Sequence, residues 1–492
     1  MGTVVDIHCH NFNGDDLPVR GFVREVHLEN RRLGNAVATL VDRVVQAKAP
    51  GYDQELARLD ALLERADRAS GLEGVGGVDA GDEAVVGPAL VPDLEQRTRA
   101  ELREMAASDP YLLDSAAAEL EETAGDTLVE TEGIGDFTAA AARAMRWATI
   151  YASSRVDVTV HLVRQFRDSV DLFTPMLVDL ELGLNDRATT SVLQQVVLQE
   201  RISRLSMLGG LPGVSRARIH PFVGFDPRRE VLSERRKEPV GALDDVQRAV
   251  THYGFVGVKL YPPMGFRPLN NATKPGGPPQ QDGAAVDRAL RRLYTWCLKE
   301  DVPVTAHCNI SNGARDAYDG FSDPDDWATV LDEFPGLHLN LGHFGGMHGS
   351  LGPTGWPHKI ASLARDGAHE PGRNLYADVG NHRTDKDEFP SYVAQLREVV
   401  FANDATRAMA GRLMYGSDWY MLAILPNVDD FMQDYDSAYA AAFGPEARDS
   451  FMGGRALAFL GFDDPANKNA IRLRERYATY APDRVPDWLA GP

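Results

Sequence analysis

The sequence predicts an α/β protein whose eight strands close into a parallel barrel. Three observations favour this fold class. From about residue 170 onward, short β-rich runs alternate with amphipathic helical stretches, and alternating β and α elements form parallel sheets. Together with a run at the N-terminus, the β-rich runs number eight. No glycine-rich phosphate-binding turn follows the first run, whereas an open doubly wound sheet, the competing architecture, usually carries one there.

The predicted strands begin close to the N-terminus and recur through most of the chain. They are residues 3–10, 171–181, 217–226, 254–263, 302–308, 337–343, 374–380 and 412–419. Amphipathic stretches lie between them, for example at 188–208, 286–300 and 389–403. Eight strand-and-helix units, most of them roughly 35 to 50 residues long, are typical of a (β/α)₈ TIM-type barrel.

The chain is longer than such a barrel requires, and the excess falls between the first two strands. The predicted parts are strand 1 at 1–10, a mostly helical insertion at 11–145, the remainder of the barrel at 146–462 and a C-terminal extension at 463–492. Six glycines at 71–88 indicate a mobile stretch within the insertion. The helical pattern at 138–166 would be the barrel's own first helix.

The composition limits the kinds of molecule that the protein is expected to bind. The 492 residues include 72 Asp and Glu against 51 Lys and Arg, a formal net charge of −21. Such a surface repels nucleic acid and anionic lipid, so we expect small-molecule substrates. No apolar run approaches the ~20 residues of a membrane span, and the first strand leaves no room for a signal peptide. Three cysteines form no disulfide framework, so we expect a cytoplasmic protein.

Five ionisable residues fall at the ends of predicted strands. They are His8 and His10 in "DIHCH", His307 in "TAHC", His343 in "LGH" and Asp418 in "YGSD". In a barrel of this kind all strand C-termini surround one point, and active sites form there. We therefore expect these residues to converge, although they span more than 400 positions of the chain.

The converging residues predict a metal centre. Several imidazoles and one carboxylate form a ligand set for a first-row divalent ion, zinc foremost. Side chains alternate along a strand, so His8 and His10 would both point into the barrel mouth while Cys9 points outward. The alternative interpretation, independent structural histidines, does not account for the shared position at strand ends.

The motifs "DIHCH", "TAHC", "LGH" and "YGSDW", in this order on successive strand ends, resemble the metal-dependent amidohydrolase superfamily. More narrowly, they resemble the amidohydrolase-related branch that includes aminocarboxymuconate semialdehyde decarboxylase and several small-acid hydrolases. The resemblance covers residues 1–14 and roughly 170–462, including "GVKLYPP" and "FMGGRALAFLGF". The insertion has no counterpart in it.

This resemblance implies a set of roles. His8, His10, His307 and Asp418 would hold one divalent ion, most simply Zn²⁺, with Mn²⁺ or Fe²⁺ as alternatives, and His343 would lie beside the water molecule on it. Asp418 would also accept the proton of that water and pass it to a leaving group. The resemblance further suggests a homodimer. Asp6 shares the inward face of the first strand, where it would serve either as a partner to these groups or as a structural residue.

Lys259 and its neighbours are the ambiguous candidates. In binuclear relatives a lysine on the fourth strand, carboxylated by CO₂, bridges two metals; the alternative is a plain ammonium that binds an anionic substrate. Tyr261 lies on the same face. Arg267 follows the strand and would pair with a substrate carboxylate. The remaining candidates for substrate contact, each alternatively a structural or solvated residue, are Asn309, Asn381 and Trp419.

The leading hypothesis is a metal-dependent hydrolase that uses an activated water on an amide, lactone or related bond of a small, carboxylate-bearing molecule. A metal-dependent non-oxidative decarboxylase of an aromatic or unsaturated acid is the alternative, which a narrow, arginine-lined pocket would favour. A second alternative is an inactive barrel that acts as a binding protein. The sequence contains no GxSxG elbow, GxxxxGK[ST] loop or GxGxxG turn after a strand, which argues against other common enzyme classes.

Overall fold

The computed structural model covers the barrel region well and the predicted insertion in part. The residues it describes are 2–22, 42, 45, 48–72, 147–214, 216–274, 276–278, 281–310, 313–346, 354–364, 373–382, 386–423 and 430–490. Most of the insertion predicted at 11–145, including nearly all of the glycine-rich stretch at 71–88, lies outside the described residues, so its helical character stays a prediction.

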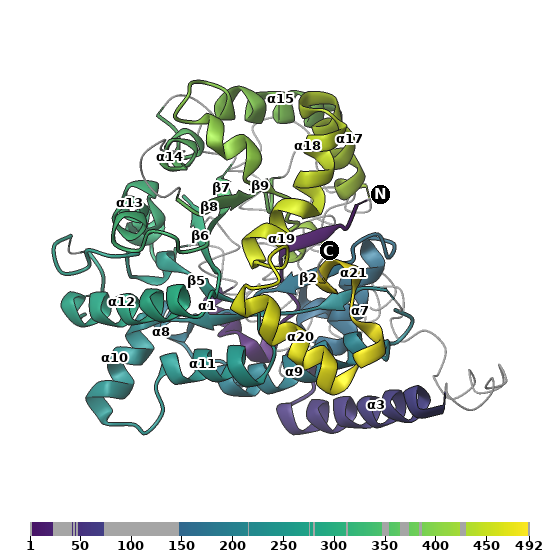
Figure 1. Cartoon of the computed structure of the whole chain (residues 1–492). Coiled ribbons are helices and arrows are strands. Elements are labelled where there is room, and N and C mark those ends of the chain that lie inside the picture. The colour runs from purple at the N-terminus through teal and green to yellow at the C-terminus, as the bar shows by residue number, and fades with distance from the viewer. Residues whose placement is uncertain are drawn as a thin grey trace, which may run out of the picture.

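All described strands are parallel and fall into two ladders (Figure 1). The first has the order β1 (Val5–Cys9), β2 (Leu172–Pro175), β3 (Arg218–Ile219). The second has the order β4 (Phe222–Phe225), β5 (Gly257–Leu260), β6 (Val304–Asn309), β7 (Leu339–Gly345), β8 (Leu375–Asp378), β9 (Leu413–Met414). In Figure 1 these strands lie at the centre, and helices surround them. The predicted α/β class with parallel strands is confirmed.

Backbone contacts outside the ladders join them at both seams. Met176, just after β2, forms an isolated parallel bridge with Phe222 of β4. On the other side, the Ile7 N–H of β1 donates to the carbonyl of Tyr415, just after β9 (3.3 Å). The eight predicted strands therefore follow one another side by side, but they pair as two ladders rather than as the single closed ladder expected of an ideal barrel.

Proline and glycine explain the interruptions. The predicted strand at 217–226 is divided into β3 and β4 at Pro221, which has no N–H to donate to a ladder. Beyond β9, a Cβ on Gly416 would lie only 2.8 Å from the Cβ of His8. Glycine therefore lets this segment pass close to β1, where the Asp418 N–H donates to the carbonyl of His8 (2.7 Å).

Helices follow most of the strands. The longer ones are α3 (Tyr52–Leu72), α7 (Arg155–Gln165), α9 (Val192–Leu208), α10 (Pro227–Arg236), α11 (Ala242–His252), α12 (Gly283–Lys299), α13 (Pro324–Glu333), α14 (Trp356–Leu363), α15 (Phe389–Val400), α17 (Phe431–Phe443) and α20 (Lys468–Tyr480). The short ones are η1 (Gly14–Asp16), α1 (Val19–Phe22), α8 (Glu181–Leu184), η4 (Pro262–Met264), η5 (Asp316–Ser322), η6 (Lys386–Glu388), η7 (Arg407–Gly411), α16 (Trp419–Leu422), α18 (Pro445–Asp449), η8 (Ser450–Gly454), α19 (Arg455–Leu460), η9 (Pro482–Arg484) and α21 (Asp487–Ala490). None of these described helices combines the length and apolarity needed to cross a lipid bilayer.

Local sequence signals set several helix boundaries. The Ser191 side chain accepts from the Gln194 N–H in a capping box at the start of α9, and Gly209 ends that helix in the left-handed conformation. α10 and α13 each begin with an Asp cap followed by proline at the first position. These caps fix where each helix begins after the preceding strand end and loop.

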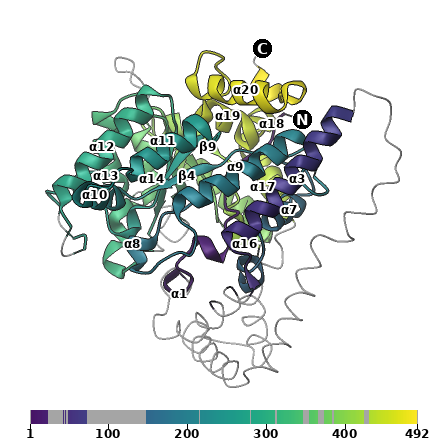
Figure 2. The same cartoon turned by 90° about the horizontal axis from the view of Figure 1, so that it is seen from below.

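The described part of the insertion packs against the barrel. Figure 2 shows α3 lying along α9. At its surface, Arg58 of α3 makes a bidentate pair with Asp157 of α7, both N–O distances being 2.8 Å. α3 is thus docked on the helical layer of the barrel rather than separate from it.

A fully buried guanidinium holds the same elements together from inside. Arg155 of α7 donates through Nε and Nη2 to the two carboxylate oxygens of Asp16 (2.8 and 2.6 Å) and through Nη1 to Glu55 of α3. Its Nη2 also donates to the Thr190 hydroxyl (3.0 Å). We call Arg155, Asp16, Glu55 and Thr190 the Arg155 cluster.

Candidate active site

Strand β1 delivers two imidazoles to one buried cavity. His8 and His10 are 1% and 8% exposed, and both line the cavity, whereas the intervening Cys9 is buried elsewhere in the core. This alternation is what the period of two along a strand predicts. The expectation that both imidazoles share one face is therefore confirmed.

The same cavity collects side chains from the ends of distant strands. Lys259 of β5, His307 of β6, His343 of β7 and Asp418 after β9 all line it. Each of these four side chains is buried, and the cavity has a volume of about 40 Å³, enough for a few water molecules. We call His8, His10, His307, His343 and Asp418 the histidine cluster.

Asp378, at the end of β8, fixes His8 and was missed in the sequence. His8 Nδ1 lies 2.9 and 3.0 Å from the two carboxylate oxygens of Asp378. Because an ionised carboxylate only accepts, Nδ1 carries the proton and Nε2 keeps its lone pair. The Lys259 ammonium donates to that Nε2 (3.1 Å). Asp378 follows an apolar run at a strand end, as His343 and Asp418 do. This position in the sequence could have identified it as a site residue.

Asp378 is itself firmly held. Beyond His8, it accepts from the side-chain amide of Asn340 (2.7 Å) and from the backbone N–H groups of His343 (3.1 Å) and Gly380 (2.9 Å). Burial alone would raise the pKa of Asp378, but His8 and these donors lower it below the ordinary value. Asp378 is therefore an anion that orients His8.

His10 and Asp418 present converging ligand atoms. His10 Nδ1 lies 2.8 Å from the carbonyl of Met176, so it donates there and leaves Nε2 as the acceptor. That Nε2 lies 3.4 Å from Asp418 Oδ1. Two ligands with bonds of about 2.0–2.1 Å to one tetrahedral ion stand about 3.3 Å apart.

The donor set fits a divalent cation. Ligand atoms of His8, His10 and Asp418 all lie within 4.8 Å of one another, and so do those of His8, His343 and Asp378. In the first group each histidine has its Nδ1 proton bound elsewhere, as metal-ligating histidines usually do. The chemistry of this group, two imidazoles and a carboxylate, suits zinc or a similar ion.

His307 and His343 form a pair at the other side of the cavity. His343 Nδ1 lies 2.9 Å from the carbonyl of Gly380 and donates to it, so His343 Nε2 accepts from His307 Nδ1 (3.0 Å). The Tyr261 ring stacks on His307, with centroids 4.4 Å apart. His307 thus lies beside His343 in the same cavity, outside the group formed by His8, His10 and Asp418.

The backbone is unusual at two of these positions. His343 has φ of 66° and Asp418 has φ of 47°, both in the left-handed region that side chains other than glycine rarely adopt. Such conformations persist where the surroundings determine them, and they concentrate at functional sites. The hydrogen bond from the Asp418 N–H to His8 is one such determinant.

Burial dominates the electrostatics of the cavity. It lowers the pKa of His10 to about 3, that of His343 to about 4 and that of Lys259 to about 8. Burial would raise the pKa of Asp418, yet the neighbouring imidazoles hold it below its ordinary value. At neutral pH His10 and His343 are therefore neutral and Asp418 is ionised, the protonation states that metal ligands require.

Asp6 has a structural position. Its carboxylate accepts from the Ser417 hydroxyl (2.6 Å), the Ser417 N–H (3.0 Å) and the His8 N–H (3.3 Å), and burial raises its pKa to about 7. Asp6 thereby ties β1 to the residue before Asp418. It acts as a positioning residue and does not line the cavity.

An aromatic wall completes the cavity. Phe12 and Tyr420 stack with centroids 4.6 Å apart, and Tyr151 stacks on Tyr420 at 5.5 Å. The other described residues that line the cavity are Phe22, Val178, Leu180, Tyr261 and Met421. Most of these side chains carried no signal in the sequence, because nothing distinguishes them from ordinary core residues before the fold is known.

Several predicted contact residues do not reach the cavity. The Arg267 guanidinium donates to Asp326 (2.7 Å) and lies over the Phe321 ring, 4.4 Å from its centroid. Trp419 is buried against His161, their ring centroids 5.4 Å apart. Asn309 and Asn381 are also absent from the described lining. Of the five residues predicted to contact substrate, only Tyr261 lines the cavity among the described residues.

Comparison with known proteins bears on this site. Residues 231–462 match the family model described as amidohydrolase, while no curated protein sequence matches the chain. The matched residues include His307, His343, Asp378 and Asp418. His8 and His10 lie outside the matched range, and the fold brings them beside the matched residues.

Several solved structures are weakly similar to this chain. An amidohydrolase from Burkholderia multivorans with bound zinc is 14% identical, covering 62% of this chain and 87% of its own, with a TM-score of 0.37. The 4-oxalomesaconate hydratase of Rhodopseudomonas palustris is 14% identical, covering 75% and 92%, with a TM-score of 0.37. Dihydroorotase from Campylobacter jejuni is 13% identical, covering 61% and 79%, with a TM-score of 0.35. At TM-scores below 0.5 these likenesses add nothing to the assignment.

The family model is the comparison that bears on the function of this site. It does not confirm the narrower resemblance to the branch of aminocarboxymuconate semialdehyde decarboxylase, which stays a prediction. Residues 231–462, a little under half of the chain, are similar to the amidohydrolase family.

Proposed function

We propose that this enzyme is a hydrolase of small molecules that works with one divalent ion, most simply Zn²⁺. His8, His10 and Asp418 would hold the ion, with His307 as the predicted fourth ligand. The observation that carries the proposal is the convergence of ligand atoms of His8, His10 and Asp418, with His8 and His10 each oriented by a partner outside the group. Manganese or iron(II) would suit the same donors less specifically.

The roles of the side chains follow from their positions. A divalent ion at these donors would lower the pKa of a water molecule toward ~7 and make a nucleophile available at neutral pH. Asp418, ionised and beside His10, accepts the proton of the attacking water and delivers it to the leaving group. His343 faces the same cavity, where it would lie beside the attacking water. The Lys259 ammonium offsets negative charge that develops there.

The lining supports hydrolysis over decarboxylation. Lys259 is the one Lys or Arg among the described residues that line the cavity, whereas a pocket for decarboxylation of an acid would be expected to carry an arginine beside the metal. The stacked Phe12, Tyr151 and Tyr420 favour a substrate with a flat, unsaturated or aromatic part. We therefore propose an amide or lactone attached to such a group as the substrate class.

Decarboxylation remains the second candidate because two observations favour it. The cavity is narrow, at about 40 Å³, and Lys259 lies inside it with its amine near the metal ligands. A carboxylate beside this ammonium would be positioned for loss of CO₂.

One panel of substrates separates the two reactions. The zinc-loaded enzyme is incubated with aryl lactones, aryl amides and matched aromatic acids, and ring-opened or cleaved product is measured beside released CO₂. We expect cleavage of a lactone or amide, and an Asp418→Asn variant should lose roughly 10²–10⁴-fold in rate. Release of CO₂ without hydrolysis would overturn the proposal in favour of the decarboxylase, and equal rates in Asp418→Asn would remove Asp418 from the mechanism.

A further inference from the structure

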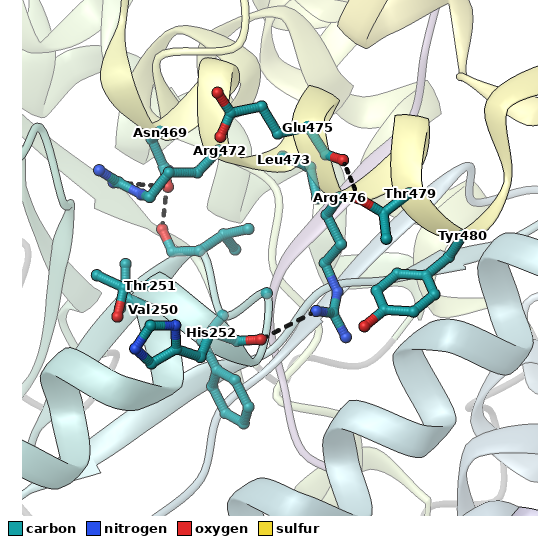
Figure 3. Close-up of a pocket in the computed structure, with 13 residues that line it drawn as sticks. Val250, Thr251, His252, Asn469, Arg472, Leu473, Glu475, Arg476, Thr479 and Tyr480 are labelled. Atoms are coloured by element: carbon teal, nitrogen blue, oxygen red, sulfur yellow. Dashed lines mark hydrogen bonds between the residues drawn. The ribbon is translucent and has the colours of Figure 1, made fainter.

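A second cavity lies at the opposite end of the barrel from the active site. Its volume is about 240 Å³, and it opens between the end of α11, the segment 254–256 and helix α20 (Figure 3). Phe255 and Val256 line it just before β5 begins, whereas Lys259, near the other end of β5, lines the active site. The two cavities therefore lie at opposite ends of the same strand.

Two arginines of α20 dominate the cavity. Arg472 and Arg476 are four residues apart, so they lie on one face of the helix, and both line the cavity. Figure 3 shows Arg476 between His252 and Tyr480, and Arg472 near Asn469. The Arg476 guanidinium donates to the carbonyl of His252 (3.2 Å), and it lies over the Tyr480 ring, 4.9 Å from the centroid.

The backbone is adapted to this guanidinium. A Cβ on Gly254 would lie 2.3 Å from Arg476 Nε, and Gly254 has φ of 75°, a conformation that favours glycine. Arg476 is only 9% exposed. Glycine at this position thus makes room for a buried cation at the wall of the cavity.

Neither arginine has its charge fully matched. Among the described residues, Nε of Arg472 and Nε of Arg476 have no hydrogen-bond partner. Arg472 makes one long hydrogen bond, to the side-chain oxygen of Asn469 (3.3 Å), and its ion-pair partner, Glu300, is 4.0 Å away. A largely buried guanidinium normally has a bidentate acceptor, which Arg472 lacks.

The neighbouring carboxylate is shared among several cations. Arg476 pairs with Glu200, but Glu200 also pairs with Arg201 (2.5 Å) and lies 3.9 Å from Arg204. Arg201 has a second partner in Asp60, whereas the others depend on Glu200. Glu200 therefore divides its two carboxylate oxygens among three guanidinium groups, one of which lines the cavity.

We propose that this cavity binds the oxyanion group of a small molecule, a phosphate or a carboxylate, between Arg472 and Arg476. The oxyanion supplies the bidentate acceptor that Arg472 lacks. Val250, Phe255 and Leu473 line the cavity with apolar surface, which suits the carbon part of such a ligand. Glu475 also lines it and would repel a second anionic group, so the ligand carries its charge at one end.

Calorimetric titration of the full-length protein tests this site. Inorganic phosphate and acetate are the two probes, each at constant ionic strength set with sodium chloride. The same titration in a His8→Ala/His10→Ala variant excludes binding at the active site. We expect at least one of the two probes to saturate at one equivalent, in the wild type and in the variant alike. The probe that saturates, or that binds more tightly if both do, identifies the oxyanion.

Two variants decide where the probe binds. Arg472→Gln should weaken binding at least tenfold, because it removes one guanidinium, and should leave the melting temperature of the free protein nearly unchanged. Arg235→Gln, at an exposed arginine of α10 paired with Asp282, is the matched control and should bind as the wild type does. Failure of both probes to saturate, or unchanged affinity in Arg472→Gln, would overturn the proposal.

Discussion

The Arg155 cluster and the histidine cluster are both buried groups of ionisable side chains, yet their internal contacts differ. In the Arg155 cluster one guanidinium meets two carboxylates and a hydroxyl, so its donors point at acceptors within the cluster. In the histidine cluster the acceptor atoms of His8, His10 and Asp418 point at one another, and two of its members have left-handed backbone.

This difference separates a structural role from a functional one. In the Arg155 cluster, donors that meet acceptors within the cluster connect α3, η1 and α7, and no ligand is needed to explain their arrangement. Acceptors that converge suit a cation between them, because their lone pairs repel one another and His8 and His10 are each held in place by a partner behind the ring. Burial alone does not distinguish the two clusters.

The largest effect is expected at Arg155. Arg155→Gln leaves Asp16 and Glu55 buried without their cation, which should lower the free energy of unfolding by about 3–5 kcal/mol. Metal content per folded molecule should not change. Urea unfolding followed by circular dichroism measures the first quantity.

Arg58→Gln is the control for this variant. Its pair with Asp157 joins the same two helices at the surface, where an ion pair contributes at most about 1 kcal/mol. If Arg155→Gln were no more destabilising than Arg58→Gln, the Arg155 cluster would not have the structural role assigned to it.

A smaller effect is expected at Asp378, which belongs to neither cluster but orients His8. Asp378→Asn replaces one acceptor of the His8 Nδ1 proton with an amide donor, and it should weaken metal binding about 10–100-fold. Competition with a chelator gives the affinity. Asp245→Asn, at a buried aspartate of α11 that pairs with Arg229, should bind metal as the wild type does; an equal loss there would attribute the effect to general destabilisation.

At neutral pH the smallest effect is expected at His220, a buried histidine outside both clusters. It contacts the Ser203 hydroxyl (3.2 Å) and the Tyr477 hydroxyl (3.1 Å), and burial lowers its pKa to about 3. Between pH 6.5 and 3 the unfolded chain therefore binds a proton that the folded chain does not. Stability should fall as pH decreases through this window, by up to about 1.4 kcal/mol per pH unit from this group.

His220→Gln should flatten that part of the stability profile, measured by urea unfolding at a series of pH values, and should leave metal content unchanged. A profile as steep as that of the wild type would show that other groups cause the acid sensitivity. Loss of metal would show that His220 affects the active site.

Much of the site could be predicted from the sequence because its ligands stand at strand ends. His8, His10, His307, His343 and Asp418 each follow an apolar run, and a parallel barrel brings such positions to one place whatever their separation in the chain. The same rule applies to Asp378, which was overlooked because an aspartate at the end of a strand is also a common turn residue.

Loop residues were predicted less well. Arg267 has the chemistry to bind a carboxylate, but its direction depends on Asp326 and Phe321, which come from other segments. The aromatic wall of Phe12, Tyr151 and Tyr420 is assembled from three distant segments, and no periodicity in the sequence connects them. The positions of strand ends can be predicted from the local sequence pattern, whereas the direction of a loop side chain depends on tertiary packing.

The most direct test of the account is the metal content per chain, measured by plasma mass spectrometry on protein purified without chelator or added metal. We predict about one equivalent of zinc in the wild type and in His220→Gln, and none in His8→Ala/His10→Ala. Two equivalents would contradict the single-ion proposal and identify Lys259 as a carboxylated bridge. Absence of metal from the wild type, even after incubation with zinc or manganese, would contradict the assignment of the histidine cluster as a metal centre.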